Sequence, residues 1–152
     1  MEHTNTAQYR SYQGGYFKTL IAPEQANNAL ALLEFTLPKG AEPPPHTHTN
    51  EDETFYVLEG SISVTIADNT TILEPGEAVF APRNIPHSFQ ILTEKATLIN
   101  LISPGSLWNF FIQFSAPVSG QPAISTTPNP PPPDKIKQMQ DVISNEYKVI
   151  FA

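Results

Sequence analysis

Residues 43–60 read PPPHTHTNEDETFYVLEG, a window with two of the four histidines of the chain and three consecutive acidic residues, directly before a strand-like run. Such a window is either a solvated acidic turn or part of a metal site. His46 and His48 are two residues apart, so on an extended chain both imidazoles point to the same face. Two imidazoles on one face can bind the same cation, and the interpretation depends on which other side chains join them.

Two further candidate ligands are a carboxylate in the same window and a histidine in a later one. Glu53 lies five residues after His48, an odd interval that places its carboxylate on the opposite face of a continuous strand. The intervening TNED is turn-prone, and a bend or bulge there can turn Glu53 back toward the histidines. Asp52 offers the same chemistry. His87 follows a proline-bracketed turn in PRNIPHSF, whereas His3 lies in the polar N-terminal tail.

Short β-branched or aromatic runs alternate with turn signals at the spacing of a sandwich or barrel. Ile62, Val64 and Ile66 alternate with polar residues, which is the period of a strand with one buried face. No helical pattern long enough for a crossover lies between the runs, so we expect mostly antiparallel sheets. Eight strands are predicted, at 15–22, 29–37, 54–58, 61–66, 70–73, 78–81, 87–92 and 96–102. This pattern predicts an all-β fold, closed as a barrel or jelly roll.

The pattern changes from strand to helix after the last of these runs. Four apolar residues have the spacing i, i+3, i+4 and i+7 of one helix face: Leu107, Phe110, Phe111 and Phe114. This predicts a short helix with Ser106 as its N-cap. We expect it to cover one end of the barrel or to form a dimer contact. A sharper alternative makes Trp108 and the phenylalanines part of a pocket lid.

The C-terminal part of the chain is rich in proline and then becomes helical. Residues 116–133 hold seven of the sixteen prolines, which predicts an extended linker. The following DKIKQMQDVISNEY predicts a closing helix with Asp134 as its cap. We therefore divide the chain into a barrel domain with an N-terminal arm and a short covering helix at 1–115, the linker, and a helical segment at 134–152 that packs on the barrel.

Composition excludes several classes of function. Fifteen acidic and eight basic residues give a net charge of −7, and no cationic cluster is present, which argues against binding of nucleic-acid phosphates. The absence of cysteine excludes disulfides, thiolate ligands and a cysteine nucleophile, so any metal is held by nitrogen and oxygen. No apolar run is long enough to cross a bilayer, and residues 1–10 lack the apolar core of a secretory signal. We expect a cytoplasmic protein that does not enter a membrane.

Both histidine windows are flanked by glycine or proline at fixed intervals. The first window has five residues at fixed intervals: Gly40, His46, His48, Glu53 and Gly60. The second has three: Gly76, Pro82 and His87. Across roughly residues 15–103, the sequence resembles the cupin superfamily, whose two motifs have these spacings. Asn84 and Ile91 stand where the second motif usually has glycine and asparagine. Asparagine tolerates a left-handed conformation better than most residues, and Ile91 is not at a ligand position.

The resemblance implies a double-stranded β-helix, or jelly-roll barrel, that holds one divalent transition metal. The interval of six residues to Gly60 matches the motif from Glu53 and not from Asp52. The implied metal ligands are His46, His48, Glu53 and His87. A set of imidazoles and one carboxylate suits Fe, Mn, Ni, Cu, Co or Zn and does not select among them.

The wider sequence is most similar to single-domain cupins related to quercetin 2,3-dioxygenase. That resemblance implies a metal-dependent dioxygenase of enol or phenolic small molecules, with Glu53 as both ligand and catalytic base. Fold and donor set do not fix the reaction, so a non-catalytic small-molecule or metal-binding cupin and a cupin isomerase or decarboxylase stay open. Apolar aromatic segments at 9–16 and 107–114 exceed what a barrel needs and predict a homodimer.

Overall fold

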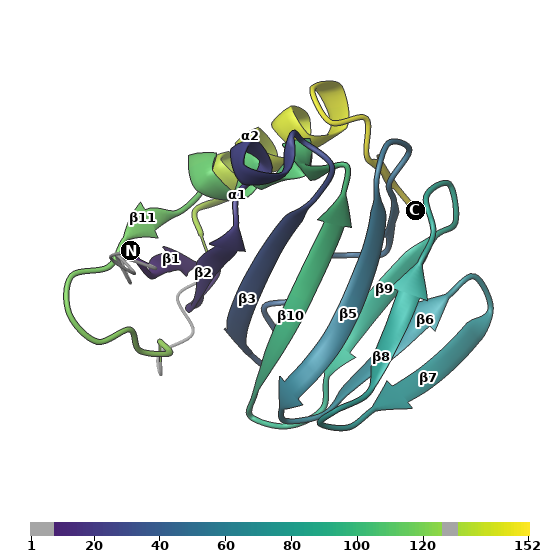
Figure 1. Cartoon of the computed structure of the whole chain (residues 1–152), viewed down its shortest axis with the longest axis horizontal. Helices are drawn as coiled ribbons and strands as arrows, with labels where there is room; N and C mark the ends of the chain where they lie inside the picture. Colours follow the sequence, from purple (N-terminus) through teal and green to yellow (C-terminus); the bar gives the residue numbers. More distant parts are fainter. Residues whose placement is uncertain (1–7, 126–130) are drawn as a thin grey trace.

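The computed structural model describes residues 8–125 and 131–152 and contains two antiparallel sheets (Figure 1). The first sheet has, in spatial order, β11 (Ala116–Pro117), β1 (Arg10–Tyr12), β2 (Gly15–Ile21), β3 (Ala31–Pro38), β10 (Lys95–Ser103), β5 (Asp52–Glu59) and β8 (Ala78–Ala81). The second has β12 (Ile150–Phe151), β4 (His46–Thr47), β9 (His87–Ile91), β6 (Ile62–Ile66) and β7 (Asn69–Leu73). The predicted all-β jelly-roll fold is confirmed.

The inward faces of the two sheets form an apolar core. Alternate residues of β6 and β5 are buried, and the intervening ones are more exposed, as the two-residue period requires. The same alternation on β10 buries Ala96, Leu98 and Ile102, with Asn100 as the one polar residue of this row. The core residues of both sheets belong to one hydrophobic cluster. A single apolar interior therefore holds the barrel together.

All eight predicted strands are present, with ends that shift by up to two residues. The four strands that sequence reasoning missed, β1, β4, β11 and β12, are only two or three residues long. Such short segments carry little pattern of their own and become strands because a partner lies beside them. β12, for example, pairs with β4 from the other end of the chain.

The helices begin at different residues from those predicted. Gly105–Leu107 forms a 3₁₀ turn that contains Ser106, and α1 (Trp108–Gln113) follows it without a side-chain cap. Ser106 is therefore not the N-cap. The second helix, α2 (Pro133–Asn145), begins one residue before Asp134. Proline suits the first helical position because its φ is already helical and no N–H is lost, while the carboxylate lies in the first turn, where the helix dipole favours it.

Both helices lie over one end of the barrel (Figure 1). Phe110 of α1 contacts the ring of Tyr147 at 5.9 Å between centroids, and Met139 is the buried residue of α2. The predicted linker at 116–133 begins with β11, which pairs with β1, and residues 126–130 of it lie outside the described part. Within the described part of the chain, no helix is long and apolar enough to span a membrane.

Candidate metal centre

The four predicted ligands come together inside the barrel. His46 lies on β4, His48 follows that strand, Glu53 is on β5 and His87 opens β9. β4 and β9 are paired with His46 opposite His87, which sets these two imidazoles side by side. All four residues are buried, and one donor atom from each lies within 4.8 Å of the other three.

The donor atoms are arranged around one carboxylate oxygen. Glu53 Oε2 is 3.0 Å from His87 Nε2 and 3.2 Å from His48 Nε2. The Nε2 atoms of His46 and His48 are 3.1 Å apart. All three histidines thus present the same ring nitrogen to a common point.

A break between β4 and β5 resolves the odd interval between His48 and Glu53. The strand stops after Thr47, and β5 starts at Asp52. The break is fixed from the second motif, because the backbone N–H of Asn84 donates to the carbonyl of His48 at 2.7 Å. Asn84 has φ 66°, the left-handed conformation for which the usual glycine is suited and which asparagine tolerates.

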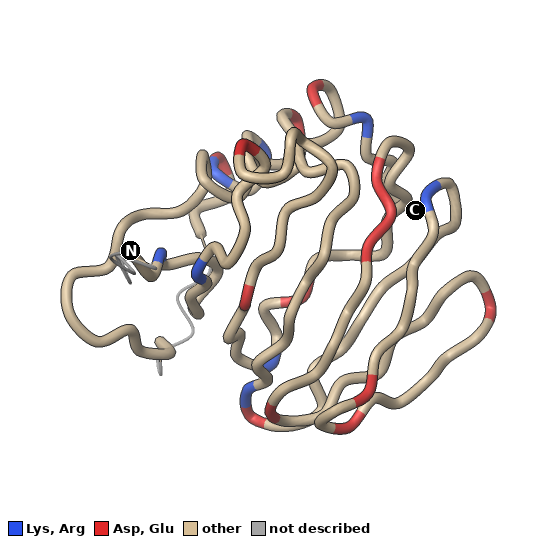
Figure 2. Tube along the Cα trace, viewed as in Figure 1, with Lys and Arg blue, Asp and Glu red and all other residues tan. Residues whose placement is uncertain are grey.

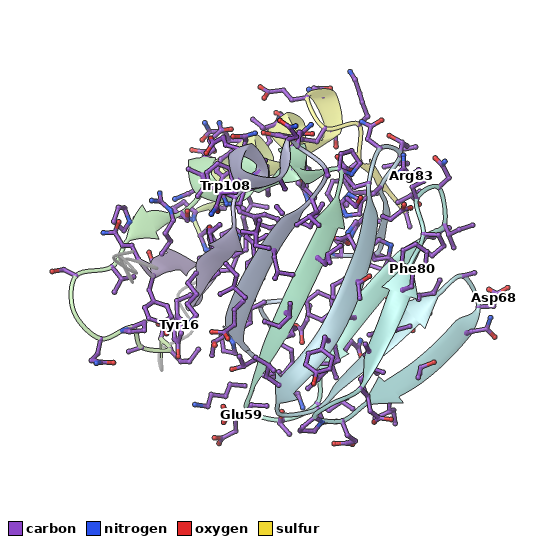
Figure 3. The ribbon with its side chains drawn as sticks, in the orientation of Figure 1. Tyr16, Glu59, Asp68, Phe80, Arg83 and Trp108 are labelled. Carbon is purple, nitrogen blue, oxygen red and sulfur yellow. The ribbon has the colours of Figure 1, made fainter. Side chains whose placement is uncertain are left out.

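Asp52, the competing carboxylate, is directed to the surface. It pairs with Arg83 at 3.1 Å, and Figure 3 shows Arg83 on the outside of the molecule. Figure 2 shows the acidic run as a continuous red stretch at the start of β5. Although these acidic residues are consecutive, only Glu53 joins the donor cluster, as the motif spacing predicts.

The outer nitrogens of the three imidazoles face acceptors. His46 Nδ1 donates to the carbonyl of Pro44 at 2.8 Å, and His87 Nδ1 lies 3.4 Å from the carbonyl of Ile85. His48 Nδ1 lies 3.4 Å from Glu51 Oε2, and neither of these two buried atoms has a hydrogen bond within the described residues. Assigned from these partners, a proton on each Nδ1 leaves the Nε2 lone pair for a cation.

Without a metal, burial and the neighbouring charged groups have opposite effects on the pKa values of the cluster. Burial lowers the pKa of His46 to about 4 and keeps its imidazole neutral. Burial also disfavours the charged form of His48, but the carboxylates of Glu53 and Glu51 outweigh it and raise its pKa to about 10. Burial of Glu53 is likewise outweighed by His48 and His87, so its pKa lies well below the usual value. A cation would take the position of the His48 proton.

The residues fit a divalent transition metal. Three imidazole nitrogens and one carboxylate oxygen converge, and their outer atoms have the orienting acceptors that metal-binding histidines require. This donor set is one that Fe, Mn, Ni, Cu, Co and Zn all accept. A metal that binds four protein ligands in octahedral geometry keeps two positions for other molecules.

A cavity of about 260 Å³ lies against the donor cluster. Its walls are mainly aromatic and aliphatic and include Phe35, Leu98, Phe110, Phe111, Met139 and Ile143. None of the described residues that line it is lysine or arginine. Glu42, another lining residue, accepts a hydrogen bond from the backbone N–H of Ile91 at 2.6 Å, where the family usually has asparagine.

The first helix covers the end of the barrel, as one interpretation predicted, and two of the three phenylalanines of the predicted helix, Phe110 and Phe111, also line the cavity. Trp108 and Phe114 are not among the lining residues, and the indole N–H of Trp108 donates to Thr19 Oγ1 at 2.9 Å.

Sequence reasoning missed two buried polar residues beside the cluster. Glu51 was not distinguished from its acidic neighbours, and nothing in the local sequence separates it from them. Asn100 could have been found, because it interrupts an alternating row of apolar residues on a predicted strand. Its Nδ2 lies 3.4 Å from Glu53 Oε1, so it contacts the candidate ligand directly.

Residues 33–102 match the Cupin_2 family, described as a cupin domain. The chain therefore contains a cupin domain. It is 30% identical over 103 residues to quercetin 2,3-dioxygenase of Bacillus subtilis, and 39% identical over 66 residues to the pectin degradation protein KdgF of Dickeya dadantii. These matches cover 68% and 43% of this cupin and span only 31% and 60% of the two relatives.

A solved structure, KdgF from a Halomonas species, aligns with this cupin at a TM-score of 0.58 and 24% identity. The alignment covers 66% of this chain and 91% of the other. At this level of identity, the likeness supports the fold of the cupin and not its reaction.

Proposed function

We propose that this cupin is a metal-dependent oxygenase of small enol or phenolic molecules. The observation that carries the proposal is the position of the donor cluster, which faces a cavity with mainly aromatic and aliphatic walls. An apolar ring compound with one ionisable hydroxyl matches such a site, because the ring is buried against the walls and the oxygen reaches the cluster. Similarity to quercetin 2,3-dioxygenase supports the same substrate class.

A bound redox-active metal would supply positions for the substrate oxygen and for O2. The chain supplies the base. Glu53 is ionised, since its pKa lies well below the usual value, and its Oε2 lies at the point where the imidazoles converge. It can accept the proton of a substrate hydroxyl when its contact with the metal weakens. The apolar walls exclude water and strengthen the electrostatic interactions around this proton.

Two other classes of function differ in their need for oxygen. A cupin isomerase or decarboxylase would use the metal as a Lewis acid without O2, and a binding cupin would hold its ligand unchanged. Similarity to a pectin degradation protein makes a sugar acid a candidate ligand. The absence of lysine and arginine among the described lining residues disfavours this candidate, because anionic ligands are usually held by such side chains.

The test measures O2 uptake by untagged protein reloaded with Fe, Mn, Ni, Cu, Co or Zn. The probes are 3-hydroxyflavone, 2,4-pentanedione and catechol. We expect uptake with at least one redox-active metal and none with zinc. Conversion of a probe without O2 consumption would identify the isomerase or decarboxylase class, and binding without conversion would identify a binding cupin.

The control is His48→Ala, which removes one of the four converging donors. We expect this variant to lose metal and activity and to keep the far-UV spectrum and cooperative melting of the parent, because the apolar core does not depend on the cluster. Loss of a ligand should weaken the site by more than the tenfold to roughly hundredfold typical of outer-shell changes. A full equivalent of metal in the variant would show that the ligands are wrongly assigned.

A further inference from the structure

Asn100 is a polar residue in an otherwise apolar row. On β10 the inward positions are Ala96, Leu98, Asn100 and Ile102, and Asn100 is only 6% exposed. It lines the cavity and lies beside Glu53. An apolar residue would satisfy the packing of this position, so the amide requires another explanation.

The orientation of the amide follows from its neighbour. Nδ2 donates to Glu53 Oε1 at 3.4 Å. The reversed orientation would place the amide oxygen against an ionised carboxylate, which is unfavourable. Oδ1 is therefore the free end of the side chain, and it is buried with no hydrogen-bond partner within the described residues. A buried acceptor without a donor is costly unless a bound molecule supplies one.

We propose that Asn100 determines ligand specificity by accepting a hydrogen bond from a second O–H or N–H group of the ligand. The ligand class is a vicinal donor pair: an ortho-diphenol, an enediol or an amino-enol. One oxygen reaches the donor cluster, and the neighbouring donor reaches Asn100 Oδ1. This inference rests on the proposed function for the place of the first oxygen, and it does not require turnover.

The chemistry predicts strong discrimination at this position. A site built to accept from a hydroxyl rejects an analogue that lacks it, because the buried acceptor is then left unpaired. Catechol and 2-methoxyphenol form a suitable probe pair, since methylation removes one donor and keeps the ring and the other hydroxyl. A bound metal also favours catechol, because the two catechol oxygens can chelate it. Only the part of the preference that depends on Asn100 therefore tests the inference.

The experiment measures the dissociation constants of both probes by calorimetry for the parent and for Asn100→Leu, each with zinc and metal-free. We expect the parent to prefer catechol. We expect the ratio of the two dissociation constants to narrow about tenfold in Asn100→Leu, equivalent to about 1.4 kcal/mol. If Asn100 has a purely structural role, its substitution would weaken the binding of both probes alike. An unchanged ratio of the two dissociation constants would therefore overturn the inference.

The matched control is Leu98→Val, which alters the cavity wall two residues away on the same strand face without removing a polar group. This variant should change the dissociation constants of both probes by a similar factor. If Asn100→Leu does not fold, Asn100→Ala is measured in the same way. A crystal structure of the parent with catechol provides a second test. A free hydroxyl outside hydrogen-bond distance of Asn100 Oδ1 in that structure would overturn the inference. If the ratio of dissociation constants narrows but no O2 is taken up, the role of Asn100 in specificity is supported and the proposed oxygenase activity is refuted.

Discussion

At the residue scale, the centre depends on one buried carboxylate. Glu53 is tolerated in the interior because its Oε2 faces two imidazoles and its Oε1 faces an amide. Motif spacing alone distinguished Glu53 from the two acidic residues before it. In the structure Asp52 instead forms an ion pair with Arg83 at the surface. The position of Glu51 beside His48 could not be predicted, since it depends on the break between β4 and β5.

Glu51→Gln tests whether Glu51 orients the His48 ring. The substitution keeps the size of the side chain and removes the charge beside His48 Nδ1. Because such outer acceptors raise ligand basicity and fix the ring, we expect metal affinity to fall roughly tenfold to a hundredfold with the fold intact. Competition with a chelator of known affinity measures the change.

Glu59→Gln is the control for this substitution. It makes the same chemical change at an exposed position on the far end of β5 (Figure 3), and it should leave metal affinity unaltered. Equal affinities for the Glu51 variant and the parent would remove Glu51 from the account of the site.

At the element scale, local pattern predicts the long strands and fails for the short ones. β6 is evident from the alternation of Ile62, Val64 and Ile66, whose period is present in five consecutive residues. β4 has two residues and exists because β12 and β9 flank it, which no local pattern can encode. This short strand nevertheless carries His46, so its placement depends on a segment about a hundred residues away.

Met139→Ala tests the packing of α2 on the barrel. Met139 is the buried residue of this helix, lines the cavity and lies with its sulfur 3.4 Å from Gln13 Nε2. Truncation should lower the free energy of unfolding by about 2 kcal/mol or more, since it leaves a void in the apolar cluster. We also expect weaker binding of apolar probes with an unchanged metal content.

Lys137→Ala on the exposed side of α2 is the matched control. It removes only the surface pair with Asp141, which is worth about 0.5 kcal/mol or less. Chemical denaturation compares the two variants, and equal stabilities would mean that α2 does not depend on this contact with the barrel.

At the scale of the whole molecule, the barrel and the site have separate supports. The apolar cluster spans both sheets, whereas three of the four donor residues line a cavity to which both helices also contribute. Repeated alternation predicted the barrel, and the resemblance to the two cupin motifs predicted the candidate ligands. The sequence did not predict that Ile143 from the C-terminal helix and Phe110 from the first would share a cavity, because that contact joins segments on either side of the proline-rich stretch.

The predicted homodimer also belongs to this scale. The aromatic segments at 9–16 and 107–114, which predicted the dimer, pack against residues of the same chain. Tyr12, for example, packs on Phe17 and Phe111. Exposed apolar side chains remain on two paired strands: Phe80 on β8 is 56% exposed and Tyr56 on β5 is 39% exposed. β8 is the edge of the seven-stranded sheet in the described part of the chain. We propose that a second copy covers this edge by a two-fold contact between β8 strands.

Light scattering at micromolar concentration tests the dimer, with Phe80→Lys to disrupt it and Leu20→Lys as control. Figure 3 shows Phe80 on the outside of the molecule, and Leu20 is similarly apolar and exposed, at 38%, but lies on β2, separated from β8 by three strands. We expect the parent and the control to be dimers and Phe80→Lys to be a monomer, because two lysines would face each other across a two-fold axis. A monomeric parent would refute the dimer. A dimer that persists in Phe80→Lys and is lost in Leu20→Lys would place the contact on the other side of the sheet.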